Sequence, residues 1–144
     1  MTKTIYLMGS LRNPDIPELA VSIRKEGWDV FDDWYAPGPK ADDYWKDYSQ
    51  RRGQSFRDAL ASFSAGQVFA FDHHHLGRSH IGVLVHPAGK SCHLELGYMI
   101  GQGKPCVIYW PNGEPPKDRW DVMVKFADTA FSFNELIGQL KVYK

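Results

Sequence analysis

The stretch Lys3-Thr4-Ile5-Tyr6-Leu7-Met8-Gly9-Ser10-Leu11-Arg12-Asn13-Pro14 decides the fold class. A short apolar run that ends in glycine is typical of a buried strand. Asn13 is a favourable helix cap and Pro14 is tolerated in a first turn, so a helix should follow directly. Apolar residues then recur at helical spacing until Gly27, at Ile16, Leu19, Ala20 and Ile23. The stretch therefore predicts a strand that runs directly into a helix.

The rest of the chain continues this alternation. Further strands are expected at Trp28–Phe31, Ile81–Val85, Cys106–Tyr109 and Ala127–Phe131. Helices are expected over 56–63 and, after a kink near 64–66, over 65–76. Two more are expected from residue 91 or 92 to about 103 and from about 133 onward. Alternating strands and helices imply right-handed crossovers and a parallel sheet. The prediction is an α/β fold over residues 1–144: a single-domain, flavodoxin-like (Rossmann-like), five-stranded parallel sheet with helices on both faces.

Two segments interrupt the pattern. Residues 32–48 contain Pro37-Gly38-Pro39, which predicts irregular structure, and they are rich in aromatic side chains. Long loops of this composition are more often functional than structural, so we expect an aromatic functional loop over 34–48. Residues 111–119 are proline-rich and predict a surface loop.

Composition excludes several classes of protein. The 144 residues are 43% apolar and 24% charged, typical of one soluble globular domain. Lys plus Arg and Asp plus Glu both number 17, so no basic excess favours polymeric nucleic acid. No apolar run approaches the ~18 residues that span a membrane. The first residues lead straight into a strand, so no signal peptide and a cytoplasmic location are expected.

Two turns are expected to meet at one crevice, because ligands of such sheets bind at the carboxyl ends of the strands. Gly9-Ser10-Leu11-Arg12 combines a hydroxyl, a guanidinium and a helix N-terminus, which suits a phosphate, although an ordinary strand-to-helix turn is an equal alternative. Gly89-Lys90-Ser91 is not a P-loop, since Leu84 stands where that motif needs its first glycine. Its backbone N–H groups can still face an anion.

Two acids stand out. Asp72 follows an apolar helical stripe formed by Ala65, Val68 and Phe69. An inward carboxylate is costly unless it is paired, protonated or facing a cavity, and a boundary Asp bonded to a neighbouring backbone group or histidine is the alternative. Glu95 lies in the first turns of its predicted helix. It is either a nucleophile at the crevice or an acid that complements the helix dipole.

No metal site or cofactor is predicted. The consecutive histidines 73–75 point about 100° apart on a helix and cannot share one ion. His86 and His93 can approach each other, but no acid or cysteine at suitable spacing completes a site. Cys92 and Cys106 both lie in apolar surroundings typical of core thiols, so no disulfide framework is expected.

In order and spacing, three features resemble the nucleoside 2-deoxyribosyltransferase superfamily, and most of all its nucleoside 5′-monophosphate N-glycosidase (N-hydrolase) branch. The first is the opening strand and turn, Ile5 to Arg12. The second is Asp72, eight residues before the strand that starts near His80. The third is Glu95-Leu96-Gly97-Tyr98 followed by Gly103-Lys104-Pro105. The resemblance covers residues 4–110 and implies the flavodoxin-like fold.

The resemblance also implies roles for individual residues. Glu95 would be the nucleophile at C1′ of a (deoxy)ribose, Asp72 would protonate the leaving base, and Tyr6 would position Glu95. Ser10 and Arg12 would bind a 5′-phosphate. Further phosphate contacts are expected from Gly9, Gly89, Lys90 and Ser91. The base is expected to lie against aromatic rings, with Trp34, Tyr44, Trp45 and His86 as candidates.

The predicted function is cleavage of the N-glycosidic bond of a (deoxy)nucleoside 5′-monophosphate or nucleoside, with transfer of the sugar to water or to another base. A glutamate that traps the developing sugar cation and a second carboxyl that supplies a proton are the groups this chemistry needs. The alternatives are an NAD-type glycohydrolase and a non-catalytic nucleotide-sensing module. The resemblance implies a homodimer or higher homo-oligomer.

Overall fold

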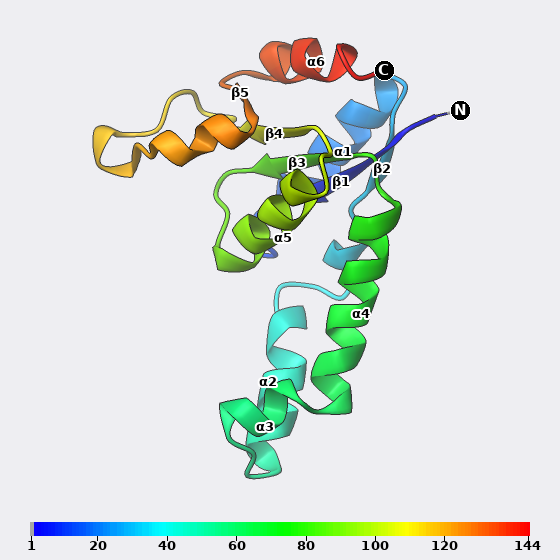
Figure 1. Cartoon of the computed structure of the whole chain (residues 1–144), viewed down its shortest axis with the longest axis vertical. Helices are drawn as coiled ribbons and strands as arrows, with labels where there is room; N and C mark the ends of the chain where they lie inside the picture. The colour runs from blue at the N-terminus through cyan, green and yellow to red at the C-terminus, as the bar shows by residue number, and fades with distance from the viewer. Residues whose placement is uncertain (1) are drawn as a thin grey trace.

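A computed structural model describes residues 2–144 and contains a five-stranded, all-parallel sheet in the order β2-β1-β3-β4-β5 (Figure 1). The strands are β1 (Thr4–Met8), β2 (Asp29–Phe31), β3 (Ile81–Val85), β4 (Cys106–Tyr109) and β5 (Asp128–Ala130). The predicted fold class is therefore confirmed. β1 lies between β2 and β3, where Tyr6 is opposite Phe31 on one side and Gly82 on the other.

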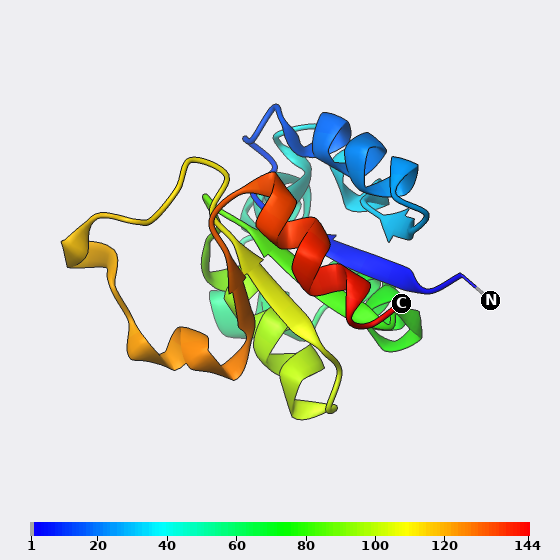
Figure 2. The same ribbon diagram turned by 90° about the horizontal axis from the view of Figure 1, so that it is seen from above.

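Helices cover both faces of the sheet (Figures 1 and 2). α1 (Ile16–Lys25) and α6 (Phe133–Lys141) pack with the odd-numbered residues of β1, Ile5 and Leu7. α5 (Lys90–Gly101) and the end of α4 (Phe63–Arg78) pack with the even-numbered ones, Tyr6 and Met8. Strand alternation thus sends Tyr6 to the α4–α5 side.

The predicted functional loop over 34–48 is wrong. The segment contains the short 3₁₀ helix η1 (Asp33–Tyr35), and residues from Ala41 onward belong to helix α2 (Ala41–Arg51). The proline and glycine breakers end at Pro39. Beyond them no residue interrupts a helix, Asp42 and Asp43 complement its N-terminus, and Arg51 complements its C-terminus.

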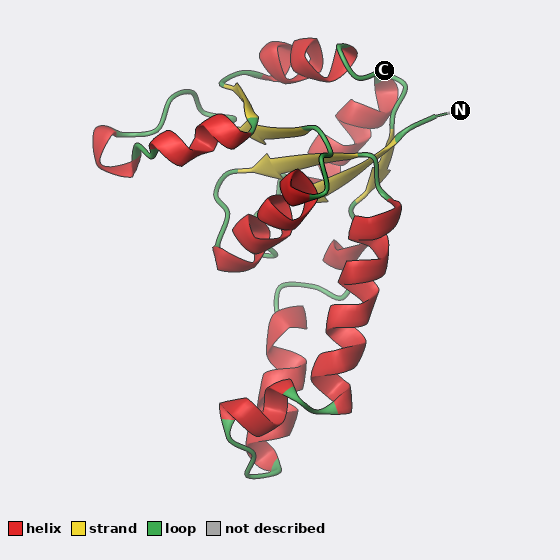
Figure 3. Ribbon diagram, viewed as in Figure 1, coloured by secondary structure: helices red, strands yellow, loops and turns green. Residues whose placement is uncertain are grey.

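The predicted kink near residues 64–66 is also misplaced. Helix α3 (Phe56–Leu60) ends before Ser62, whose side chain accepts a hydrogen bond from the Ala65 N–H at 3.4 Å and caps α4. A serine cap starts a new helix at this point, so the break comes earlier than the glycine suggested. Figure 3 shows α2, α3 and the first half of α4 extending together away from the sheet.

Residues 111–127 leave the sheet between β4 and β5 and return to it (Figure 2). They include two short 3₁₀ helices, η2 (Lys117–Arg119) and η3 (Val122–Phe126), so the predicted surface loop is longer and partly ordered. Across residues 2–144, no helix combines the length and hydropathy that crossing a membrane requires.

We predict that Leu136→Ala lowers the free energy of unfolding by about 2–5 kcal/mol, because it removes a fully buried side chain of α6 from the core. Urea unfolding followed by circular dichroism measures the change. Val142→Ala, at a side chain that is 75% exposed, is the control and should shift stability by less than about 0.5 kcal/mol. Equal effects of the two substitutions would contradict this packing.

Candidate active site

Tyr6 of β1 and Glu95 of α5 form a hydrogen-bonded pair. The Tyr6 hydroxyl donates a hydrogen bond of 2.7 Å to Glu95 Oε2. Tyr6 is 1% exposed, and burial together with the charges of Glu95 and Asp72 raises the pKa of its hydroxyl far above the ordinary range. Tyr6 therefore remains a hydrogen-bond donor at any physiological pH and fixes the position of the carboxylate.

Glu95 is held in a mostly buried position on the second turn of α5. Burial is the largest cause that raises the pKa of this carboxyl, to about 7, and the charges of Asp72 and Asp42 raise it further. The hydrogen bond from Tyr6 works in the opposite direction, because it stabilises the ionised form. Glu95 thus titrates near neutral pH, as nucleophiles and general bases often do.

Asp72, on α4, carries a charge that raises the pKa values of both Tyr6 and Glu95. Its side chain is half-buried, and burial, with a smaller contribution from Asp42, raises the pKa of its carboxyl to about 6. Within residues 2–144 its carboxylate has no hydrogen-bond partner. The alternative that Asp72 lies at the edge of the core and bonds to a backbone group or a histidine is therefore wrong. The predicted core-facing stripe is wrong as well, since Val68 and Phe69 are 44% and 68% exposed.

Asp42 was not predicted as a site residue. It lies in the first turn of α2, and its charge contributes in a minor part to raising the pKa values of Glu95, Asp72 and Cys92. The sequence placed it in a loop and gave no periodic signal for it. Helices α2, α4 and α5 therefore each carry an acid whose charge acts on the ionisation of this group.

The two predicted phosphate turns meet. The Cys92 thiol donates to the Gly9 carbonyl at 3.4 Å, which joins the turn after β1 to the start of α5. Gly9 must lack a side chain, because a Cβ there would come within 2.6 Å of Ile16 and 2.9 Å of Val85. The Ser10 hydroxyl accepts from the Arg12 N–H at 3.1 Å, so the turn is locally ordered.

The cationic groups of these turns are free in the described chain. The Arg12 side chain is exposed and makes no hydrogen bond or ion pair within residues 2–144. The pKa of Asp43 on α2 is lowered mainly by Lys46 and in a minor part by Arg12. Gly89 caps α5, and Lys90 and Ser91 form its exposed first turn. Together they can surround an anion.

The predicted base-binding rings do not form one wall. The Trp34 indole donates to the Leu7 carbonyl at 2.7 Å and packs against the residues of both faces of the sheet. Tyr44 is 59% exposed and Trp45 half-buried on α2. His86 instead stacks on Trp110 with ring centroids 5.0 Å apart, and Trp110 stacks on Phe131 at 5.1 Å. Burial, and then the charge of His93, lower the pKa of His86.

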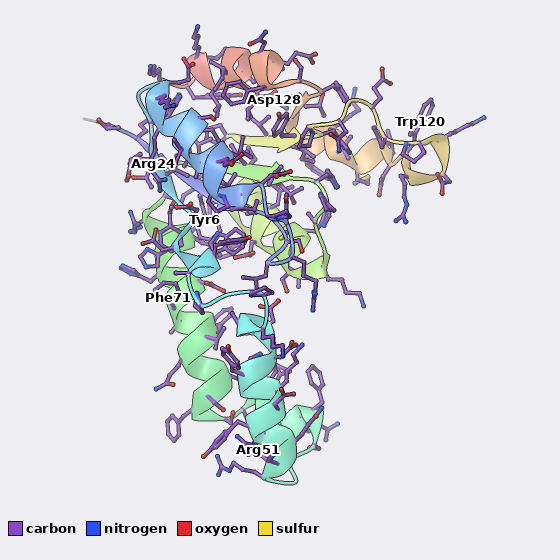
Figure 4. The ribbon with its side chains drawn as sticks, turned by 180° about the vertical axis from the view of Figure 1, so that it is seen from behind. Tyr6, Arg24, Arg51, Phe71, Trp120 and Asp128 are labelled. Carbon is purple, nitrogen blue, oxygen red and sulfur yellow. The ribbon has the colours of Figure 1, made fainter. Side chains whose placement is uncertain are left out.

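A different aromatic group lies beside Tyr6. Phe31, at the end of β2, is 5.3 Å from the Tyr6 ring and 5.9 Å from Phe71, the residue before Asp72. His75 stacks on Phe31, with ring centroids 3.9 Å apart. Figure 4 shows Tyr6 and Phe71 where the sheet meets α4. This aromatic group could have been predicted from the pairing of the first two strands, because their register sets Phe31 opposite Tyr6.

No group of three His, Cys, Asp or Glu side chains arranged to hold a metal ion occurs in residues 2–144. The three consecutive histidines contact different neighbours: His73 lies 3.0 Å from the Tyr98 hydroxyl, and His75 accepts from Arg78 at 2.7 Å. Both cysteines are buried and free.

We predict that wild-type stability falls relative to Glu95→Gln as the pH rises from about 4.5 to about 7. Glu95 ordinarily titrates near 4.5 and titrates near 7 in the folded protein, so the folded state binds more protons in this window. The stabilisation is complete below the window and is lost through it, by up to roughly 3 kcal/mol. Urea unfolding at stepped pH measures it. A stability difference that does not change with pH would refute the raised pKa.

Comparisons with known proteins bear on the fold. No protein-family model matches the chain, and no curated protein matches it significantly. Among solved structures, the Clostridium botulinum CMP N-glycosidase BcmB aligns over 96% of this chain and 99% of its own, with a TM-score of 0.55 and 13% sequence identity. At that identity the match establishes a shared fold. The chain therefore shares its fold with the structure of a CMP N-glycosidase.

Proposed function

We propose that this protein cleaves the N-glycosidic bond of a (deoxy)nucleoside 5′-monophosphate, or of the nucleoside, with Glu95 as the nucleophile. The observation that carries the proposal is the hydrogen bond from buried Tyr6 to Glu95, and the charge of Asp72, which acts on both groups, supports it. The fold shared with a CMP N-glycosidase supports the same reaction class.

The proposed reaction has two steps. A Glu95 oxygen attacks C1′, the C1′–N bond breaks, and its electron pair leaves with the base, which takes a proton from Asp72. Water or a second base then attacks C1′ and gives its proton to Asp72, while the bond to Glu95 breaks. Water yields a hydrolase and a base yields a transferase.

The two acids suit these roles as a pair. Burial raises the pKa of both, and the charge of Asp72 disfavours ionisation of Glu95, so the pair tends to hold one proton near neutral pH. Glu95 has the hydrogen bond that favours its charged form, whereas Asp72 has none. A sugar cation developing at C1′ further favours ionised Glu95. In the free protein Glu95 has the higher pKa and holds the shared proton more tightly, so the proton lies on Asp72 only once the sugar cation favours ionised Glu95.

The 5′-phosphate is assigned to the turns that flank Glu95. Arg12 supplies a guanidinium, Ser10 a hydroxyl, and Gly9 the close approach of its backbone. Lys90 and Ser91 add N–H groups at the positive end of α5, behind Gly89. Two aromatic residues are proposed to contact the base. Trp34 donates its indole N–H to the carbonyl of Leu7, the residue after Tyr6, and Phe71 precedes Asp72 in the chain.

We predict that Glu95→Ala lowers the rate of base release by about 10³-fold or more while nucleotide binding stays within a few-fold. Asp72→Asn should cost about 10²–10⁴-fold, because asparagine cannot transfer a proton. Chromatography of products from a panel of ribo- and deoxyribonucleotides, with and without an acceptor base, measures release, and calorimetry measures binding.

A wild-type protein that binds nucleotides but releases no base from any member of the panel would replace this proposal with nucleotide sensing. Unchanged turnover in Glu95→Ala would remove Glu95 from the mechanism. The control Glu18→Ala, at an exposed acid on α1, should leave the rate unchanged.

We predict that Arg12→Ala raises KM for nucleoside 5′-monophosphates about 10–100-fold and leaves KM for the matching nucleosides nearly unchanged. One charge-assisted hydrogen bond to a phosphate is worth about 1.5–3 kcal/mol, which corresponds to this range. Lys25→Ala, at an exposed cation on α1, is the matched control. Equal changes for nucleotides and nucleosides would eliminate the phosphate role of Arg12.

A further inference from the structure

Phe31 forms a lateral wall for the ring of Tyr6. The register of β1 and β2 sets the two residues opposite each other, and their ring centroids lie 5.3 Å apart with 35° between the planes. On the other side of β1 the residue opposite Tyr6 is Gly82, which has no side chain. Of the two strand neighbours of Tyr6, Phe31 alone therefore offers a side chain that can hold the ring in place.

Phe31 depends on α4 for its own packing. It belongs to β2, which is an edge strand of the sheet formed by residues 2–144, yet it is only 4% exposed. His75 stacks on it with 14° between the ring planes, and Phe71 lies 5.9 Å away. The Arg78 guanidinium lies 5.2 Å from the centre of the same ring. The last two turns of α4 thus cover the ring that holds Tyr6.

His75 is in turn held by Arg78. The Nε of Arg78 donates a hydrogen bond of 2.7 Å to His75 Nδ1, so the proton of the neutral imidazole lies on Nε2. Burial is the first cause that lowers the pKa of His75, and the charges of Arg78 and His74 lower it further. Asp33, from the segment after β2, acts to a smaller extent in the opposite direction. His75 is therefore neutral at physiological pH and accepts this bond.

A continuous series of contacts thus leads from the surface of α4 to the candidate active site. Arg78 bonds to His75, His75 stacks on Phe31, and Phe31 packs against Tyr6. The Tyr6 hydroxyl ends the series with its bond to Glu95. Reactive groups need positions accurate to about 0.5 Å, and a misplacement of about 1 Å can cost 100-fold in rate. A ring that is free to move beside Tyr6 would not give its hydroxyl that accuracy.

We propose that His75 is a positioning residue for the Tyr6–Glu95 pair, and that Arg78 holds His75 in the stacked position. The stacked imidazole keeps Phe31 against Tyr6, and Phe31 keeps the Tyr6 hydroxyl directed at Glu95. This positioning is a property of the folded protein and stands whether or not Glu95 is a nucleophile. Its effect on reaction rate rests on the proposed function.

The first test measures the Tyr6 hydroxyl proton by NMR in the absence of substrate, and Tyr6→Phe assigns its signal. A buried hydroxyl bonded to a carboxylate should exchange slowly with water. His75→Ala should speed this exchange about 10-fold, as expected for the loss of one aromatic stacking contact. His75→Phe restores a ring over Phe31 and should return the exchange rate to within about 3-fold of wild type.

Two further variants complete this test, with circular dichroism to verify folding. His73→Ala is the matched control, because His73 is an exposed histidine of α4 that lies against Tyr98. Arg78→Gln changes an exposed side chain, so it should fold normally and speed exchange by less than His75→Ala does. Arg78→Gln decides the test if His75→Ala does not fold.

The proposal would be overturned by a wild type in which the Tyr6 hydroxyl exchanges too fast to give a signal. Wild-type exchange in His75→Ala or in Arg78→Gln would overturn it as well. So would exchange in His75→Phe that stays as fast as in His75→Ala, or an equal acceleration in His73→Ala.

The second test is a double-substitution cycle on base release. His75→Ala should lower kcat about 10-fold and leave KM within about 3-fold, because the groups assigned to the phosphate and the base are unchanged. In a Tyr6→Phe background the same substitution should have no further effect, since the hydroxyl that it positions is absent. An equal loss of kcat in both backgrounds would show that His75 does not act through Tyr6. A wild type that releases no base would contradict the proposed function, and the NMR measurement would still decide the role of His75.

Discussion

The alternation of side chains along β1 is the constraint on which the rest of the structure depends. Ile5 and Leu7 are completely buried against α1 and α6, and this fixes the register in which Tyr6 and Met8 face α4 and α5. A strand that slipped by one residue would bury the Tyr6 hydroxyl among aliphatic side chains without a partner. The same burial that stabilises the sheet therefore aims the hydroxyl at Glu95.

Sequence patterns predicted the sheet well because parallel strands are buried on both faces. Each of the five strands was expected within about two residues of its observed bounds, and Lys90–Gly101 began one residue before the predicted start. Asp72 and Glu95 were proposed as site residues from their positions relative to these elements. The influence of the Asp72 charge on Glu95 depends on the packing of α4 against the sheet, which no local pattern encodes.

Helices α3 and α4 were expected, but helix α2 and the exposure of the apolar stripe on α4 were missed, for two physical reasons. The Pro37-Gly38-Pro39 sequence led to the prediction of irregular structure beyond residue 40. A proline disfavours a helix only in its own turn and the turn before it, so a helix can begin directly afterwards. The stripe at Val68 and Phe69 was interpreted as facing the core, yet periodicity shows only that a helix has an apolar side and not what covers it. Asp42 was missed together with α2, because its position in the structure depends on where that helix begins.

The stacked rings of His86, Trp110 and Phe131 follow β3, β4 and β5 and bind the ends of three adjacent strands together. The backbone N–H of Trp110 also donates to the Ala130 carbonyl at 2.9 Å. The two ends of the segment between β4 and β5 are therefore held close together. Within the connecting segment, Val124 and Ala127 pack against the buried cluster that contains Tyr6, whereas the residues from 111 to 121 precede these contacts. Doubling the length of such a loop adds only about 0.6 kcal/mol of closure entropy. Residues 111–121 can therefore change in length between related proteins at little cost to the stability of the fold.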